Sequence, residues 1–212
     1  MIWGKRFVWL HFPKCAGTKI ERLFERYFSH RSDIHQDIAD VALDPKVSWH
    51  DSLAERARRD PRFVVGDRTI ICSIRRLPGW LESRYSYEVA RSPQLNHDAK
   101  RLLLGRYLHV NGEEFHADLA AQRYLPDSVL ASPRLVFIRQ EHFGEDFRRA
   151  FAPFVDVSRI PPKEFNTLEN ATPNTVPPEI SRQLWAPDSE LYARCPHWRR
   201  VEQLAYPGTA TG

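Results

Sequence analysis

The feature that most constrains the fold is a short apolar run that leads, through a loop of proline, lysine and glycine, into an amphipathic helix. Residues 7–12 are continuously apolar or aromatic and end at Pro13, which is typical of a buried strand. After the loop, apolar side chains recur at the spacing of one helix face: Ile20, Leu23, Phe24, Tyr27 and Phe28. The intervening charged residues are assigned to the polar face: Glu21, Arg22, Glu25 and Arg26. The pattern predicts a strand, a tight loop and a helix in succession.

Two later apolar runs, residues 69–74 and 135–138, are also followed by helical patterns. Strands that alternate with helices predict an α/β fold with a mainly parallel central sheet flanked by helices. The length of 212 residues is usual for one domain, so we expect a single domain over residues 1–212. Residues 97–130 have a mixed helical pattern and are predicted to form a helical insertion within that domain.

Composition narrows the class of ligand. The net charge is only +4, a mild excess that suits a small phosphate-bearing ligand better than nucleic acid. Three widely spaced cysteines, Cys15, Cys72 and Cys195, form no CxxC pair and no zinc spacing, so no metal site is expected. No signal peptide or membrane span is evident, so the expected location is the cytoplasm.

The loop after the first strand carries the first candidate site. A strand-to-helix loop exposes backbone N–H groups, and the helix start favours an anion. Lys14 adds a positive charge, Gly17 permits close backbone approach, and Thr18 adds a hydroxyl. These residues suit a phosphate or sulfate, although an ordinary turn with an exposed lysine would have the same pattern. The loop is not a Walker A motif, because Lys14 precedes its only glycine.

The second candidate site follows the strand at residues 69–74. Arg75 and Arg76 come directly after it, Pro78 begins a helix, and Ser83 lies about two helical turns beyond Arg75. Arginine binds phosphate through two parallel hydrogen bonds, and a serine hydroxyl can complete such a site. A pair of surface arginines at a helix start is the alternative.

Together the two segments resemble the sulfotransferases that use 3′-phosphoadenosine-5′-phosphosulfate (PAPS). Residues 7–24 are similar to that family's hydrophobic strand followed by P-K-x-G-G-T. Residues 70–87 resemble its second element, in which a strand ends in arginine and a serine comes eight residues later. Residues 135–154 resemble its third strand region, and residues 166–178 its cofactor-covering loop. The chain departs from the pattern at Cys15, Ala16 and Lys19, and its proline is shifted by one residue relative to R-x-P.

The resemblance implies a three-layer P-loop-like fold and transfer of a sulfuryl group from PAPS, leaving 3′-phosphoadenosine-5′-phosphate (PAP), with no metal required. Lys14, Gly17 and Thr18 would hold the 5′-phosphosulfate. The backbone of Cys15, Ala16 and Lys19 would assist them. Arg75 and Ser83 would hold the 3′-phosphate, with Arg76 as the alternative arginine. Lys14 would also act in catalysis, by neutralising charge on the bridging oxygen as the sulfuryl group leaves.

The acceptor also needs a base, for which histidine is the usual choice. His35 is the first candidate and His50 the second, while His11 is expected to be structural. Asp37 or Glu88 could serve instead.

The expected acceptor is a hydroxyl or amine of a carbohydrate, lipid or small molecule, and a homodimer is left open. The insertion at residues 97–130 is expected to lie on the acceptor side. Two other functions compete: a P-loop-like nucleotide kinase or phosphotransferase, and a non-catalytic nucleotide-binding module.

Overall fold

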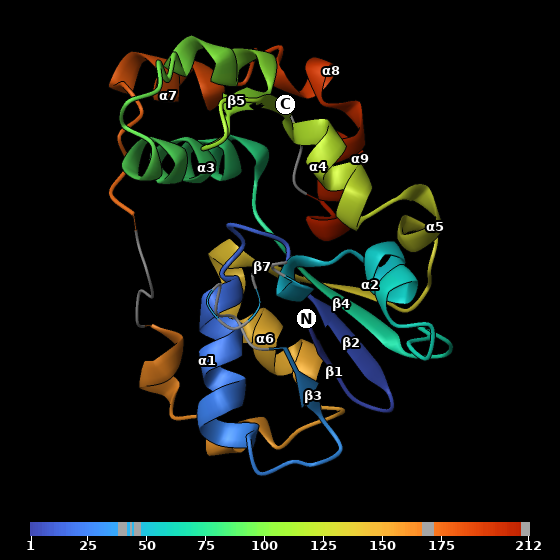
Figure 1. The fold of residues 1–212 in the computed structure, drawn as a ribbon. Helices are drawn as coiled ribbons and strands as arrows, with labels where there is room; N and C mark the ends of the chain where they lie inside the picture. Colours follow the sequence, from blue (N-terminus) through green and yellow to red (C-terminus); the bar gives the residue numbers. More distant parts are fainter. Residues whose placement is uncertain (38–41, 43, 45–47, 167–171, 209–212) are drawn as a thin grey trace. The chain divides into compact units, whose positions relative to one another are not determined.

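The computed structural model describes residues 1–37, 42, 44, 48–166 and 172–208 of the chain (Figure 1). The chain divides into two compact units. The first comprises Met1–Ile74 and Ala131–Asn170, and the second comprises Arg75–Leu130 and Ala171–Gly212. The predicted strands fall in the first unit and the predicted insertion, residues 97–130, in the second. The predictions of a single domain and of an acceptor-side insertion stay predictions.

The first unit is built on a five-stranded mixed sheet in the order β3-β1-β2-β4-β7. The central strands β2, β4 and β7 are parallel, whereas the short strands β1 and β3 are antiparallel. The strands span Ile2–Trp3 (β1), Phe7–Leu10 (β2), His35–Gln36 (β3), Thr69–Ile74 (β4) and Leu135–Arg139 (β7). The prediction of an α/β fold with a parallel sheet centre is confirmed, and the two antiparallel strands were not expected.

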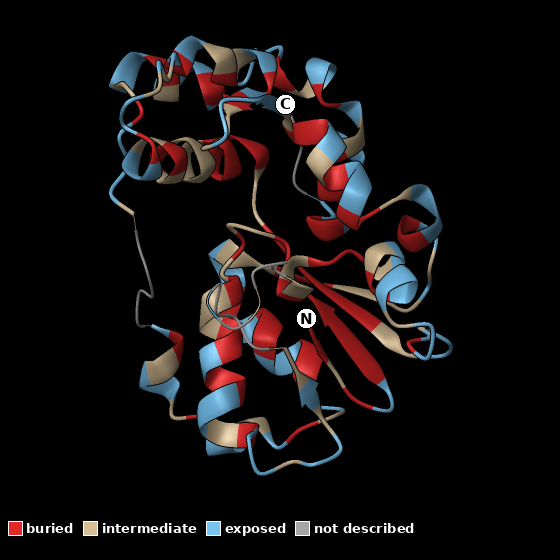
Figure 2. Ribbon diagram, in the orientation of Figure 1, coloured by how far each residue is buried: buried red, intermediate tan, exposed pale blue. Residues whose placement is uncertain are grey.

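Two helices, α1 (Gly17–Phe28) and α6 (Phe143–Phe151), share one apolar core with the sheet. The register pairs Trp9 with Ile71. Since side chains alternate across a strand, these two side chains face the same helices. The Trp9 indole Nε1–H donates to the Ser73 hydroxyl at 3.1 Å, which satisfies the one polar atom of that ring. Figure 2 shows the central strands and the inner faces of both helices as buried.

Shorter elements complete the first unit. They are η1 (Ser48–His50), α2 (Leu53–Arg59), η3 (Gln140–His142), η4 (Val157–Arg159) and η5 (Pro162–Phe165). Helix α2 begins with a capping box in which Ser52 and Glu55 each accept the other's backbone N–H.

The second unit is mainly helical, with one antiparallel hairpin of β5 (Arg106–Leu108) and β6 (Glu114–His116). Its helical elements are α3 (Leu77–Arg91), η2 (Ala99–Leu104), α4 (Ala117–Tyr124), α5 (Asp127–Leu130), α7 (Pro178–Leu184), α8 (Leu191–Arg194) and α9 (Pro196–Ala205). The buried Asp118 accepts the backbone N–H of Trp198 at 2.7 Å and so joins α4 to the first turn of α9. No helix formed by the described residues is long and apolar enough to cross a membrane.

Candidate functional site

The loop after β2 has an unusual backbone. Strand β2 ends at Leu10 and α1 begins at Gly17, so the loop lies at the carboxyl end of a central parallel strand. Lys14 and Ala16 both adopt positive φ, 66° and 62°, although each carries a Cβ. A left-handed residue costs about 1–2 kcal/mol for any residue but glycine, and such strain clusters at functional sites. Left-handed residues that alternate with ordinary ones turn successive N–H groups inward, as in anion-binding nests.

Gly17 is required by close packing rather than by its φ angle. A Cβ on Gly17 would lie 1.8 Å from Nε2 of His11, so no other residue fits there unless the ring moves. The sequence predicted either a close approach or an unusual dihedral at Gly17. The structure shows the close approach, and it places the positive φ angles on Lys14 and Ala16 instead.

The other loop residues differ in exposure. Cys15 is fully buried, whereas Lys14 and Thr18 are half-buried. The side chain of Lys19 is directed away from the loop, since its ammonium donates to the Phe165 carbonyl at 2.7 Å and lies 4.9 Å from the centre of the Phe143 ring. Burial lowers the pKa of Lys19. The side chain of Lys19 is therefore engaged with residues outside the loop, and the backbone role that the resemblance implies for Lys19 stays a prediction.

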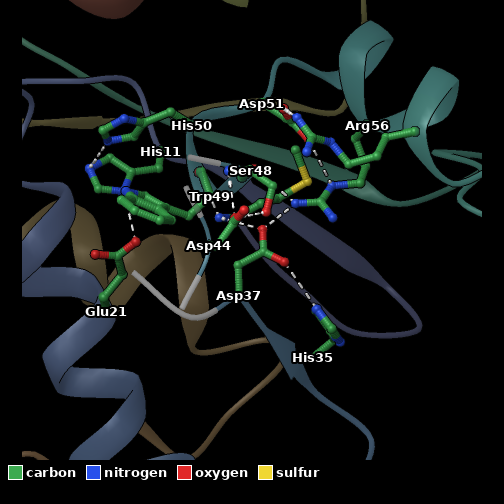
Figure 3. Close-up of polar contacts among 12 residues, drawn as sticks. His11, Glu21, His35, Asp37, Asp44, Ser48, Trp49, His50, Asp51 and Arg56 are labelled. Carbon is green, nitrogen blue, oxygen red and sulfur yellow. Dashed lines mark hydrogen bonds and ion pairs between the residues drawn. The ribbon is translucent and has the colours of Figure 1, made fainter. Parts of the chain in front are cut away.

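A buried histidine and glutamate lie directly beneath the loop. His11 Nδ1 is 2.7 Å from Oε1 of Glu21, and His11 Nε2 is 3.4 Å from Nε2 of His50 (Figure 3). The two imidazole rings meet edge to face, with centroids 4.3 Å apart. His11 and Glu21 are 5% and 6% exposed, and His50 is half-buried. The assignment of Glu21 to the polar helix face was wrong, because Glu21 lies one turn after Gly17 and so faces the ring that packs there.

A cluster of charges holds the turn that carries His50. Arg56 pairs with Asp37, and its guanidinium also donates to the Ser48 carbonyl at 2.9 Å. The Met1 α-amino group donates to the Trp49 carbonyl at 2.8 Å and lies 3.2 Å from Asp37. These contacts hold the two residues of η1 that precede His50 (Figure 3).

His35, the first candidate base, lies on the edge strand β3. Its ring stacks on Trp3 at 3.7 Å, and its Nε2 is 3.1 Å from Asp37. It therefore contacts the charge cluster rather than the loop, while His50 contacts the loop through His11. Of the other base candidates, Asp37 is held within the charge cluster. Glu88 is buried in the second unit, where it pairs with Arg84 at 2.6 Å.

The second candidate site lies along α3. Arg75 directly follows the last residue of β4, and its Nε lies 3.1 Å from where a Cβ on Gly79 would be. Ser83 is one turn beyond Gly79 on the same helix face. Arg75 and Ser83 are half-buried, and neither side chain makes a hydrogen bond or ion pair with another residue in the described part of the chain. Their polar atoms are thus available to a ligand on this helix face.

Arg76 is held differently. Its guanidinium lies 3.7 Å from the fully buried Glu202 and 4.4 Å from the centre of the Tyr206 ring. Glu202 also accepts the Leu77 backbone N–H at 2.6 Å, which ties the first turn of α3 to α9. The sequence left open whether Arg75 or Arg76 would hold the 3′-phosphate. Among the described residues, the Arg76 side chain has an ionic partner and the Arg75 side chain has none, which favours Arg75.

Comparison of the chain with protein-family models, with curated proteins and with solved structures finds no match. Within the described ranges, no group of three or more His, Cys, Asp or Glu residues is arranged to hold a metal ion.

Proposed function

We propose that the protein is a sulfotransferase with a P-loop-like α/β fold, which moves a sulfuryl group from PAPS to a hydroxyl or amine. The observation that carries the proposal is the loop of residues 11–16, a strained turn between a central parallel strand and a helix, with Lys14 and Thr18 half-buried at its rim. In parallel sheets, ligands bind at the carboxyl ends of the strands, which is where this loop lies.

The loop suits the 5′-phosphosulfate. Backbone N–H groups at a helix start and the Lys14 ammonium both favour an anion. The donor supplies the sulfuryl group, and Lys14 would neutralise the charge that grows on the bridging oxygen as this group leaves. Thr18 would donate a hydrogen bond from its hydroxyl. Positioning and charge stabilisation of this kind supply most of the catalysis in related transfers of phosphoryl groups.

Arg75 and Ser83 suit the 3′-phosphate. The Arg75 guanidinium has no ion-pair partner among the described residues and lies beside a glycine, with a hydroxyl one turn further on. Together these groups offer several donors along one helix face. Strands β2 and β4 are parallel neighbours, so the Lys14 loop and Arg75 both follow carboxyl ends at the same edge of the sheet. This order along the chain is the one that the resemblance implies for the two segments.

His50 is the better-supported base for the acceptor. It is half-buried and contacts the imidazole that packs beneath the loop, whereas His35 is tied to the edge strand. The acceptor class stays as the sequence predicted: a carbohydrate, lipid or small molecule. The cytoplasmic location and the acceptor role of residues 97–130 remain expectations of the same proposal, and the homodimer stays open.

Thermal melting in the presence of PAP, ADP or Mg²⁺-ATP tests the proposal. A ligand at ~100 times its Kd stabilises the folded state by ~2.7 kcal/mol, which raises Tm by roughly 5–11 °C in a chain of this size. We expect PAP to give a shift of this size, larger than that of ADP, and Lys14→Ala and Arg75→Ala to remove most of it. Lys5→Ala and Arg62→Ala are matched controls, since both side chains are exposed in the first unit. A shift with Mg²⁺-ATP and none with PAP would favour the kinase instead.

A further inference from the structure

Glu21, His11 and His50 form a line that runs from the interior to the half-buried rim of the first unit (Figure 3). One contact joins His11 Nδ1 to a carboxylate oxygen of Glu21, and the other joins His11 Nε2 to His50 Nε2. Each contact therefore holds one proton. We propose that these three side chains form a proton relay, in which His50 takes the proton from the acceptor and Glu21 stores it. The inference rests on the proposed sulfotransferase function and deepens it.

The hydrogen-bond geometry sets the direction of the relay. With Glu21 ionised, His11 Nδ1–H donates to the carboxylate, so His11 Nε2 can only accept. His50 Nε2–H is then the donor across the 3.4 Å contact, and Nδ1 of His50 is left as its basic nitrogen. His50 is also the most exposed member of the line, so it is the member that an acceptor reaches.

The transfer balances when the relay moves one proton along its length. The acceptor oxygen forms a bond to sulfur, the bond from sulfur to the bridging oxygen breaks, and PAP leaves with that electron pair. The acceptor proton passes to His50 Nδ1, the Nε2 proton of His50 passes to His11 Nε2, and the Nδ1 proton of His11 passes to Glu21. The relay ends neutral, so no imidazolium remains in the interior.

The surroundings of the buried pair favour that end state. Burial raises the pKa of Glu21 to about 7, against the opposing effect of the Met1 α-amino group and with a smaller contribution from the charge of Asp37. Burial, helped by the same α-amino group, holds the pKa of His11 well below its usual value. A proton that enters this pair is therefore held on Glu21 and not on His11. The other charged or titratable groups of the cluster pair with Asp37 or with Asp51. His35 and Arg56 pair with Asp37, and Arg56 and Arg59 pair with Asp51.

The position of the Glu21–His11 pair favours a role in function over a role in stability. A buried carboxylate and imidazole are costly to desolvate, and their pairing is weak evidence of a stabilising role. His11 packs against Gly17, the first residue of the helix whose start faces the proposed phosphosulfate. The relay thus passes through the side chain that supports the start of this helix.

Nuclear magnetic resonance of the ¹⁵N-labelled histidine rings tests the relay on the full chain without an acceptor. In the wild type, we expect His11 to be the Nδ1–H tautomer above about pH 7. The ring shifts of His50 should then show an inflection near the pH at which Glu21 ionises, about 7. In Glu21→Gln that inflection should vanish. Glu25→Gln makes the same change at an exposed position of α1 and should match the wild type.

Identical His50 titrations in the wild type and in Glu21→Gln would overturn the relay. An Nε2–H tautomer of His11 at every pH would also overturn it. If Glu21→Gln does not fold, the wild type still decides: the ¹³C carboxyl shift of Glu21 and the His50 ring shifts must share one inflection. PAP binding, measured on the same samples, separates the two proposals. If Glu21 and His50 titrate together but PAP does not bind, the sulfotransferase proposal is contradicted and the coupling between the two side chains stands. If PAP binds but the titrations are not coupled, only the relay is contradicted.

Discussion

The segment after β2 and the segment after β4 solve a similar problem by different means. Both connect the end of a central parallel strand to a helix, and both carry residues that suit an anion. After β2, the backbone is strained at Lys14 and Ala16 and packs tightly on His11. After β4, the helix begins at ordinary φ angles with proline in its first turn, and the Arg75 side chain lies along it. The first segment presents its backbone, and the second presents side chains.

The two glycines express this difference most clearly. A Cβ on Gly17 would meet a buried ring that is hydrogen-bonded to Glu21, whereas a Cβ on Gly79 would meet the end of a flexible arginine. A backbone site is therefore rigid and intolerant of change, while a side-chain site can adjust. This contrast predicts how each segment responds to substitution.

The largest effect is expected from Gly17→Ala. The new Cβ would lie 1.8 Å from His11 Nε2, so the ring or the start of α1 must move. We expect the free energy of unfolding to fall by about 3 kcal/mol, the upper end of the usual cost of overpacking. Urea denaturation measures this loss. A change of less than about 1 kcal/mol would show that the loop is not rigid.

The next effect is a pH dependence of stability caused by Glu21. Its pKa is raised by burial from 4.5 to about 7, so the folded state binds this proton more tightly than the unfolded state. The stabilisation is complete below the unfolded pKa and is lost as pH rises through about 7. It amounts to about 3 kcal/mol at ~1.4 kcal/mol per pKa unit. Denaturation across this pH range measures the free energy of unfolding of the wild type and of Glu21→Gln. The stability advantage of the wild type over Glu21→Gln should shrink as pH rises, whereas Glu25→Gln should show the same pH dependence as the wild type.

A smaller effect of opposite sign is expected from Ala16→Gly. Ala16 has a φ of 62°, which glycine adopts without strain, so this substitution should stabilise the fold by about 1 kcal/mol. Ala57→Gly in the exposed part of α2 is the control and should destabilise by about 1 kcal/mol. If both substitutions destabilise equally, the left-handed conformation at Ala16 is not a source of strain.

The smallest effect on stability is expected from Gly79→Ala. Alanine favours the helix by up to about 1 kcal/mol, and the Arg75 side chain can move away from the new Cβ. PAP binding, measured by calorimetry, should nevertheless weaken, because the guanidinium is displaced from the face that it shares with Ser83. Unchanged affinity for PAP would separate Gly79 and its face from the proposed site.

The sequence predicted the central strands well, because runs that are apolar on both faces have few alternatives. The run at residues 69–74 is β4 to the residue, and the run at residues 135–138 is β7 without its last residue. The first run extends only to Leu10, since His11 turns out of the strand to contact Glu21.

Other elements depended on short-range signals that the helical pattern masked. The β5–β6 hairpin lies in a stretch that was expected to be helical, although Asn111-Gly112 is a strong hairpin signal and Gly112 has a φ of 82°. The helical segment near the C-terminus is divided into α8 and α9, because Pro196 begins a new helix. The separate roles of Arg75 and Arg76 could not be predicted, since the partner of Arg76, Glu202, is more than a hundred residues away.

Calorimetric titration of the wild type and of Arg75→Ala with PAP and with AMP, which lacks the 3′-phosphate, tests the central claim most directly. If Arg75 binds the 3′-phosphate, deleting the arginine and deleting the phosphate remove the same interaction. The two losses should then be coupled by about 2 kcal/mol, the usual range for a charge-assisted hydrogen bond. Arg62→Ala should show no coupling. If PAP and AMP bind the wild type equally, or if Arg75→Ala weakens both by the same factor, the second segment does not hold a 3′-phosphate and the sulfotransferase assignment is contradicted.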